Sequence, residues 1–406
     1  MSTSLHSASP ISTVLPPRID RIKQAMAANG VDVMVCFKPE NSFYLSGFNP
    51  IIYSHPVIAI VATGHDPIML VHALRDDHGR ASAWVSDIRL YGAWSTKVTM
   101  GPNWLDALVS ILHDLGVAGK TVGIEEHFLP MQRFGQLRHA LPQATFTDVS
   151  ALIDRVRLIK DADEIAHARI AARIADRGME AAIDAIAAGG SERDISIASM
   201  HAMNTHWAAH YPQVEVCDFG SLEGGAQNGL WTWALAGDRL FYNCDNPTTR
   251  KPLPGETVAV FIWSIANGIH AENERIIACG PLPDAHRRAI DTILAIRDVV
   301  DASIRPGTPY SELFHQVKSQ LEAHGYGKYI PGRIGHGIGI GAHEHASLDA
   351  QSPLILEPGM IFTFEPNLRI PGIGGTQISD TILITDTGRE YLTQSTGGYL
   401  EVALPS

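Results

Sequence analysis

The stretch from residue 261 to residue 275 constrains the fold of this chain more than any other. It lies in a region where we predict strands over residues 258–262 and 268–272. Alternate residues of a strand point to the same face, so Glu272 and Glu274 should lie side by side. Ionisable groups held close together are typical of functional sites. The segment therefore predicts a site built on a β-sheet.

Length and composition narrow the class of protein. A chain of 406 residues is long enough for two domains, each with its own core. The formal net charge of −12 argues against nucleic acid or an anionic membrane as a partner. We see no bilayer-spanning apolar run, no signal peptide and no CxxC or zinc spacing among the four cysteines. We therefore expect a cytoplasmic protein with free thiols.

Two domains of different character follow from the pattern of apolar residues. The first part of the chain predicts an alternating α/β domain of about 155 residues. Its expected helices cover residues 18–29 and 130–140, and its expected strands cover residues 31–37, 57–62, 67–71 and 121–125. The rest predicts an α+β domain in which strands supply the site and helices cover them.

The helices of the second domain have recognisable starts. Acidic residues from Asp161 onward favour a helix start, because they interact well with the helix dipole, and Gly189 and Gly190 should end that helix. We predict a further helix over residues 284–304, capped by Asp284, and another over residues 309–324 with Pro309 at its first position. Strands are expected over residues 361–364 and 382–384.

Four motifs together resemble a known family. They are residues 261–275, Gly-His-Gly-Ile-Gly at 335–339, residues 357–366 with Glu-Pro at each end, and residues 375–380. The chain resembles the pita-bread (M24 peptidase-like) family, which includes methionine aminopeptidase, aminopeptidase P, prolidase and creatinase. The resemblance covers nearly the whole chain. It implies a creatinase/prolidase-type N-terminal α/β domain over residues 1–157 and a pita-bread catalytic domain over residues 158–406.

The positions that hold metal in this family are altered. Its peptidases bind two divalent ions with Asp, Asp, His, Glu and Glu, in that chain order. The resemblance places there Phe261, Glu272, His336, Glu365 and Ser379. Divalent ions need oxygen or imidazole ligands, whereas Phe261 has no donor atom and the Ser379 hydroxyl is neutral. We therefore expect no two-metal centre, no cofactor, and a Phe261 ring that fills the volume of the absent ion.

Within the family, the resemblance is strongest to creatinase, the metal-independent member. Residues 231–251 match creatinase without a gap, from Trp-Thr-Trp to Thr-Thr-Arg-Lys. The resemblance implies that Glu274 and Glu365 correspond to its two catalytic glutamates, while Cys244 stands where creatinase has a histidine. A pair of carboxylates suits a cationic amidine or guanidinium, and their repulsion would make one of them a proton donor.

Creatinase also completes each site from the partner subunit, and the resemblance therefore implies a homodimer. Tyr53 and His55 fall at the places of the aromatic residue and the arginine that the partner's N-terminal domain supplies to the substrate carboxylate. A second carboxylate-binding arginine has no counterpart, because residues 343–356 contain none. Losing both arginines should weaken carboxylate binding severely, so creatine is not expected as the substrate.

The remaining candidates carry alternatives. His336, between two glycines, is expected to act as a general acid or base, and Glu272 or His336 could activate water. Cys244 is either a nucleophile activated by a neighbouring imidazolium or a small buried filler. His343 is expected to contact substrate, and Trp231 either walls the site or belongs to the core.

These residues lead to one expected function and two alternatives. The main expectation is a creatinase-like, metal-independent hydrolase that cleaves a non-peptide C–N bond of a small nitrogen-rich metabolite. The first alternative keeps one ion on Glu272, His336 and Glu365 and makes the chain a peptidase-like hydrolase or a lyase. The second is a non-catalytic binding protein of the same fold.

Overall fold

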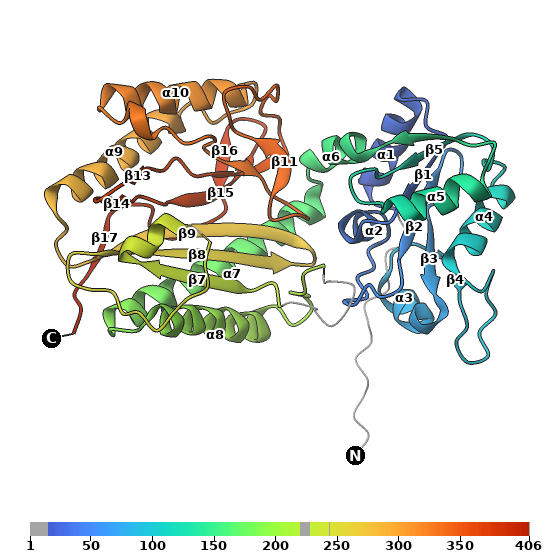
Figure 1. Ribbon diagram of the computed structural model, residues 1–406, viewed down its shortest axis with the longest axis horizontal. Coiled ribbons are helices and arrows are strands. Elements are labelled where there is room, and N and C mark those ends of the chain that lie inside the picture. Colours follow the sequence, from blue (N-terminus) through green and yellow to red (C-terminus); the bar gives the residue numbers. More distant parts are fainter. Residues whose placement is uncertain (1–14, 220–227, 243, 406) are drawn as a thin grey trace, which may run out of the picture. The chain divides into compact units, whose positions relative to one another are not determined.

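The computed structural model describes residues 15–219, 228–242 and 244–405, and the chain divides into two compact units (Figure 1). The first unit runs up to Arg157 and also takes in Phe219. The second comprises Leu158–Asp218 and the chain from Asn228 onward. Among the described helices, none has the length and apolar character that crossing a bilayer requires.

The first unit is built on a six-stranded mixed sheet in the order β4-β3-β2-β1-β5-β6. Its strands are β1 (Val33–Cys36), β2 (Ile58–Ala62), β3 (Ile68–His72), β4 (Asp87–Tyr91), β5 (Thr121–Ile124) and β6 (Thr145–Asp148). The helices are α1 (Pro17–Ala28), α2 (Pro39–Ser46), α3 (Asp76–Ser82), α4 (Trp104–Asp114), α5 (Met131–Ala140) and α6 (Ser150–Leu158). The expected α/β character is confirmed, whereas β4, β6, α2, α3, α4 and α6 were not predicted.

A buried carboxylate, that of Glu125, lies at the end of strand β5 in this sheet. Glu125 directly follows β5 and is 2% exposed. Its Oε2 atom accepts hydrogen bonds from the backbone N–H groups of Phe37 and Lys38, and its Oε1 atom accepts one from Asn41. Burial raises the pKa of Glu125 to about 7, although these hydrogen bonds oppose the shift.

The buried Glu125 predicts a pH-dependent stability. Because its folded-state pKa of about 7 lies above its ordinary value of 4.5, its contribution is fully present below pH 4.5 and is lost as the pH rises through 7. We expect the first unit to lose roughly 3 kcal/mol over this window. Urea unfolding from pH 4 to pH 8 should show this loss in the wild type and in Glu126→Gln, an exposed control. A Glu125→Gln variant with the same pH dependence would contradict the assignment.

The second unit contains a nine-stranded sheet with the main order β11-β10-β12-β15-β9-β8-β7, to which β16 and β17 add at β15 and β9. Its long strands are β7 (Trp231–Ala236), β8 (Thr257–Ala266), β9 (Ile269–Cys279) and β15 (Ser379–Ile384). The short strands are β10 (His336–Gly337), β11 (Glu344–Ser347), β12 (Ile361–Phe364), β16 (Arg389–Tyr391) and β17 (Leu400–Val402). A separate hairpin joins β13 (Arg369–Ile370) to β14 (Gly374–Gly375).

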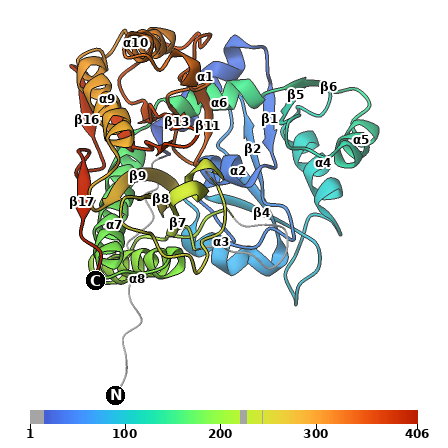
Figure 2. The ribbon, with the colours of Figure 1, turned by 60° about the vertical axis from the view of Figure 1, so that its left-hand side comes forward.

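Four helices cover this sheet. They are α7 (Ala162–Ala187), α8 (Glu192–His210), α9 (Asp284–Asp301) and α10 (Tyr310–Ala323). Apolar side chains of α7 and α8 pack on β7, β8 and β9, whereas those of α9 and α10 pack on β12 and β15 (Figure 1, Figure 2). The short connections η1 (Ala73–Arg75), η2 (Gly237–Tyr242) and η3 (Gly327–Tyr329) are 3-10 turns.

Local sequence explains where these helices begin. Asp161 caps α7 in a reciprocal capping box with Glu164, as the acidic start predicted. Asp284 does not cap α9: Pro283 holds the cap position, and Asp284 lies in the first turn. Pro309 likewise sits at the cap of α10 rather than inside it, because the helix begins at Tyr310.

The hairpin of β8 and β9 includes the strand that carries Glu272 and Glu274, which is β9. Asn267 and Gly268 form its two-residue turn, and both have positive φ angles, 44° and 82°. This is the conformation that Asn-Gly adopts most readily in a tight hairpin. The pairing sets Phe261 opposite Glu274 and Trp263 opposite Glu272, so the register of the turn decides which residues surround the two glutamates.

The buried carboxylate of Asp380 lies between two guanidinium groups and links two strands of the sheet to a helix. Asp380 on β15 accepts from Arg275 on β9 at 2.6 Å and also from Arg297 on α9. Arg297 additionally donates to the carbonyls of Phe364 and Ile378. Burial would raise the pKa of Asp380, but the two guanidinium charges outweigh it and hold the pKa below its usual value.

Removing the charge of Asp380 should destabilise the second unit. Asp380→Asn leaves two buried guanidinium groups without a counter-charge, which costs about 3–5 kcal/mol. Asp291→Asn on α9 is the matched control, because its pair with Arg287 is exposed and is worth about 0.5 kcal/mol or less. Denaturant unfolding of the two variants measures the difference, and equal losses would refute this role for Asp380.

Candidate active site

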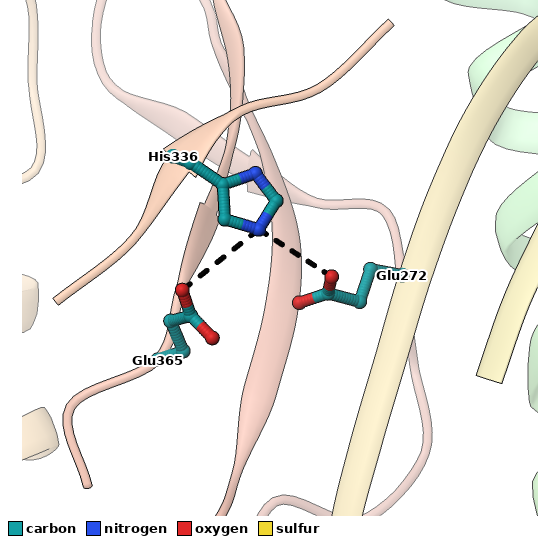
Figure 3. A group of neighbouring side chains, drawn as sticks. All are labelled: Glu272, His336 and Glu365. Carbon is teal, nitrogen blue, oxygen red and sulfur yellow. Dashed lines mark ion pairs between the residues drawn. The ribbon is translucent and has the colours of Figure 1, made fainter. Parts of the chain in front are cut away.

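Three ionisable side chains, two on strands and one directly after a strand, meet on the second unit. Figure 3 shows the His336 ring between Glu272 of β9 and Glu365, which directly follows β12. The His336 Nε2 atom lies 3.5 Å from Glu272 Oε2 and 3.8 Å from Glu365 Oε1. The sequence-based grouping of these residues thus corresponds to one cluster in space.

Backbone contacts fix the orientation of the His336 ring. Its Nδ1 atom lies 3.0 Å from the Gly337 carbonyl, and its backbone N–H donates to the Thr363 hydroxyl. A carbonyl can only accept, so Nδ1 carries a hydrogen, and Nε2 is the ring nitrogen that faces the two carboxylates. Gly335 allows this approach, since a Cβ atom there would lie 2.0 Å from the Thr363 carbonyl oxygen.

Glu272 is held in its ionised form. It is 2% exposed, and its two oxygens accept hydrogen bonds from Ser379 Oγ at 2.6 Å and from Trp263 Nε1 at 2.9 Å. Burial alone would raise the pKa of Glu272, but His336 together with these two donors outweighs it and brings the pKa to about 2. His336 responds in the opposite direction: Glu272 and Glu365 outweigh its burial and raise its pKa.

A second pair of carboxylates shares one amide. The Gln377 Nε2 atom donates to Glu274 Oε2 at 2.6 Å and to Glu365 Oε2 at 3.3 Å. Burial, followed by the negative charges of Glu272 and Glu365, raises the pKa of Glu274 well above its usual value. Burial and then the charge of Glu272 also raise the pKa of Glu365 to about 7. Both shifts favour the protonated form of the carboxyl group.

Phe261 lies among aromatic side chains beside Glu274. Its buried ring stacks parallel on Trp233, with centroids 5.1 Å apart, and its backbone pairs with that of Glu274. Trp263 meets Trp233 edge to face at 5.2 Å. Trp231, at 47% exposure, does not belong to the core, which leaves the wall of the site as its candidate role.

His343 extends the cluster toward solvent. Its ring lies 4.2 Å from that of His336 and meets Trp263 edge to face. Desolvation of the ring and then the charge of His336 lower the pKa of His343 to about 4. His343 is therefore neutral at physiological pH and can donate or accept a hydrogen bond at the exposed edge of the cluster.

A pocket opens beside Glu365. Its volume is about 530 Å³, and we call it the Glu365 pocket, defined by Arg333, Glu365, Asn367, Arg369 and Gln377. Sequence reasoning missed both arginines. Arg333 was passed over although it stands two residues before the Gly-His-Gly motif, and Arg369 follows the Glu-Pro motif by three residues. Proximity to these motifs was the signal that could have found them.

Other expected site residues are placed differently. The Cys244 thiol is exposed, so the alternative of a buried filler is wrong, and Cys244 lies close enough to Glu274 to contribute to the raised pKa of that carboxyl. Tyr53 is 3% exposed and lies in an apolar cluster of the first unit, with Phe48, Val57 and Met69. Its ring is therefore not on the surface from which a partner's site could be completed, whereas His55 is exposed. The completion of each site in a homodimer stays a prediction.

The comparison with known proteins shows the family. Residues 166–386 match the metallopeptidase family M24, and residues 18–159 match the creatinase/prolidase N-terminal domain. The fold and the motifs define a two-domain pita-bread protein, as expected. The chain belongs to metallopeptidase family M24.

Similar proteins span almost the whole chain. A putative dipeptidase of Bacillus subtilis (strain 168) is 25% identical over 378 residues, which cover 93% of this chain and 97% of that protein. The Xaa-Pro dipeptidase of Lactobacillus helveticus is also 25% identical, with coverage of 93% and 96%. The solved Xaa-Pro dipeptidase from Bacillus anthracis has a TM-score of 0.80 at 23% identity, covering 95% of this chain and 99% of that one. The prolidase from Pyrococcus horikoshii OT3 has a TM-score of 0.76 at 23% identity, covering 94% and 99%.

These comparisons correct the main functional expectation. The relatives are named as dipeptidases that cleave peptide bonds, and the matched family is one of metallopeptidases. The expectation of a creatinase-like, metal-independent hydrolase of a non-peptide C–N bond is wrong. That expectation gave too much weight to the absence of metal ligands at Phe261 and Ser379. It gave too little weight to Glu272, His336 and Glu365, whose donor atoms lie close together.

The cluster fits one metal ion. Donor atoms of Glu272, His336 and Glu365 all lie within 4.8 Å of one another. Ligands at about 2.0–2.2 Å from a common ion are separated by roughly 3–4 Å, which matches the two distances from His336 Nε2. The hydrogen on Nδ1 is bound to a backbone carbonyl, as is usual for a metal-ligating histidine. A second, bridged ion does not fit, because Phe261 offers no donor and Ser379 gives its hydrogen to Glu272.

Replacing the two residues that lack ligand groups should create a second ion site. We expect the double variant Phe261→Asp/Ser379→Glu to bind one more divalent ion than the wild type, because it restores the two missing carboxylate ligands. Elemental analysis of the folded, dialysed protein measures the stoichiometry. Phe261→Leu is the control and should match the wild type. Equal metal content in the wild type and the double variant would refute the role of these two positions.

Proposed function

We propose that this chain is a peptidase-like hydrolase that cleaves the C–N bond of a small, dipeptide-sized substrate with one divalent ion held by Glu272, His336 and Glu365. The observation that carries the proposal is the meeting of these three donors around a single point. The dipeptidase names of the relatives support the type of bond. The volume of the Glu365 pocket, about 530 Å³, suits a small ligand.

The site residues have separate tasks in such a reaction. A bound divalent ion would polarise a carbonyl oxygen and lower the pKa of water. Ser379 and Trp263 each donate a hydrogen bond to Glu272 and so keep its carboxylate charged and correctly turned. His336 presents Nε2 because Gly337 engages Nδ1. Phe261 and its stacked partner Trp233 exclude water from the opposite side.

Glu274 is the proton donor in this proposal. Cleavage of a C–N bond releases an amine, which must gain a proton as it leaves. Burial and then the charges of two nearby carboxylates raise the pKa of Glu274 well above its usual value, which favours its protonated form. Gln377 donates to its Oε2 atom, which leaves Oε1 available to carry that proton. His343, neutral at physiological pH, contributes a hydrogen bond to the substrate rather than a charge.

Metal binding and turnover test the proposal together. We expect the purified chain to hold a single divalent ion, and a chelator should abolish cleavage of Xaa-Pro dipeptides until metal is restored. His336→Ala should weaken metal affinity by more than the roughly 10–100-fold typical of an outer-shell change. His345→Ala is the control, because His345 is exposed and outside the cluster. Dipeptide cleavage that survives complete removal of metal would overturn the proposal.

A further inference from the structure

A buried ion pair joins two segments of the second unit that lie far apart in the sequence. The Lys160 Nζ atom lies 2.8 Å from Glu344 Oε2, and only 1% of the lysine side chain and 6% of the glutamate side chain are exposed. Lys160 directly precedes the Asp161 cap of α7. Glu344 is the first residue of β11 and directly follows His343. The pair therefore connects the start of the second unit to a residue of the candidate site.

Net stability does not explain this pair. Taking a lysine and a glutamate out of water costs several kcal/mol per ion, and their attraction does little more than offset that cost. Apolar side chains of similar size often give equal or greater stability at such places. A buried pair does determine where its two segments meet, because any other arrangement leaves a buried charge without its partner. The contribution to be explained is thus one of position.

The backbone is anchored at both ends of the pair. The Lys160 N–H donates to the carbonyl of Gly359, two residues before β12. Glu344 stands opposite Gly337 in the antiparallel pairing of β11 with β10. The lysine is therefore held by the segment before β12, and the glutamate is held by the strand that carries His336.

The last glycine of the Gly-His-Gly-Ile-Gly motif packs against the pair. A Cβ atom at Gly339 would lie 2.8 Å from Lys160 Cε and 2.9 Å from Glu344 Oε1, so the pair leaves no room for a side chain there. The Gly339 carbonyl accepts a hydrogen bond from the backbone N–H of His270 on β9 at 2.7 Å. The ion pair and β9 thus enclose the connection between β10 and β11 from two sides.

His343 is the residue through which the pair reaches the site. It ends that connection, and its ring contacts the rings of His336 and Trp263 with centroids 4.2 Å and 5.2 Å away. The His336 ring is oriented by the Gly337 carbonyl. Within the described residues, no hydrogen bond orients the His343 ring in the same way, so its place depends on where the backbone holds it. The neighbouring Glu344 supplies that hold.

We propose that the ion pair of Lys160 and Glu344 sets the position of His343 at the exposed edge of the site, so that substrate binding depends on it. This inference rests on the proposed function, in which His343 gives a hydrogen bond to the substrate. Lys160 and Glu344 are positioning residues, because both lie outside the group of donors that could hold the ion. Their effect on turnover passes through the imidazole of His343.

The first experiment removes both charges at once. Lys160→Met/Glu344→Met replaces the pair by apolar side chains of similar length, so no unpaired buried charge remains, and denaturant unfolding should show a stability near that of the wild type. We expect KM for Ala-Pro to rise about fivefold, the factor that one neutral hydrogen bond contributes. The value of kcat should change little, because that bond forms before the reaction and persists during it. An unchanged KM in the folded double variant overturns the inference.

A thermodynamic cycle determines whether the pair acts through His343. His343→Ala should raise KM by a similar factor, and adding Lys160→Met/Glu344→Met to it should raise KM no further. Arg169→Met/Glu390→Met is the matched control, because it removes a partly exposed ion pair of the same unit and should leave KM unchanged. Independent effects that multiply in the triple variant would contradict the proposed route through His343.

A second variant displaces the pair while keeping both charges. Gly339→Ala places a methyl group against the ends of two flexible side chains, which can move aside, so the fold should persist. We expect a rise in KM in the same direction as in the double variant. Gly388→Ala is the control, because a Cβ atom there meets nothing within 4 Å. A KM of Gly339→Ala equal to that of the wild type would count against the positioning role.

Coordinates separate this inference from the proposed function. A crystal structure of Lys160→Met/Glu344→Met should show the His343 ring moved from its place 4.2 Å from the His336 ring, while Glu272, His336 and Glu365 stay together. That result supports the positioning of His343 even where the wild type cleaves no dipeptide, and then the proposed function alone fails. An unmoved His343 ring, together with metal-dependent dipeptide cleavage, supports the proposed function and overturns this inference.

Discussion

The buried contact of Asp380 with Arg275 and Arg297 underlies the rest of the second unit. It joins β15 to β9 and to α9, and Arg297 also reaches the carbonyl at the end of β12. The strands that carry Glu272 and Ser379, and the strand that Glu365 follows, are therefore fixed by one electrostatic centre. Charges that are far from solvent interact strongly, so this centre holds the acidic site residues in place against their mutual repulsion.

The sequence predicted the parts of the fold whose signal is local. The central strands β1, β2, β3 and β5 are apolar runs, and their positions were predicted to within a few residues. Strands β4 and β6 were missed because both are edge strands, and edge strands with one exposed face lack a continuous apolar run. The capping box of Asp161 was readable, whereas the cap of α9 was misassigned because Pro283 took that position.

The sequence predicted which residues form the candidate site, but it did not predict the type of reaction that they support. Glu272, Glu274, His336 and Glu365 were all expected in one cavity, and they lie together. The error lay in preferring a metal-independent hydrolase because Phe261 and Ser379 remove the two-metal centre, although Glu272, His336 and Glu365 could still hold one ion. The arginines of the pocket could not be derived, because a hairpin and a loop bring them together and no periodic pattern encodes that proximity.

The glycine before His336 has a consequence for interpreting variants. Gly335 leaves no room for even a methyl group beside the Thr363 carbonyl, so any other residue there must push β10 away from β12. The imidazole would then leave the two carboxylates although no reacting group had been altered. Loss of turnover after such a substitution would resemble a defect in proton transfer, yet its origin would be a displaced main chain, and only coordinates could tell the two apart.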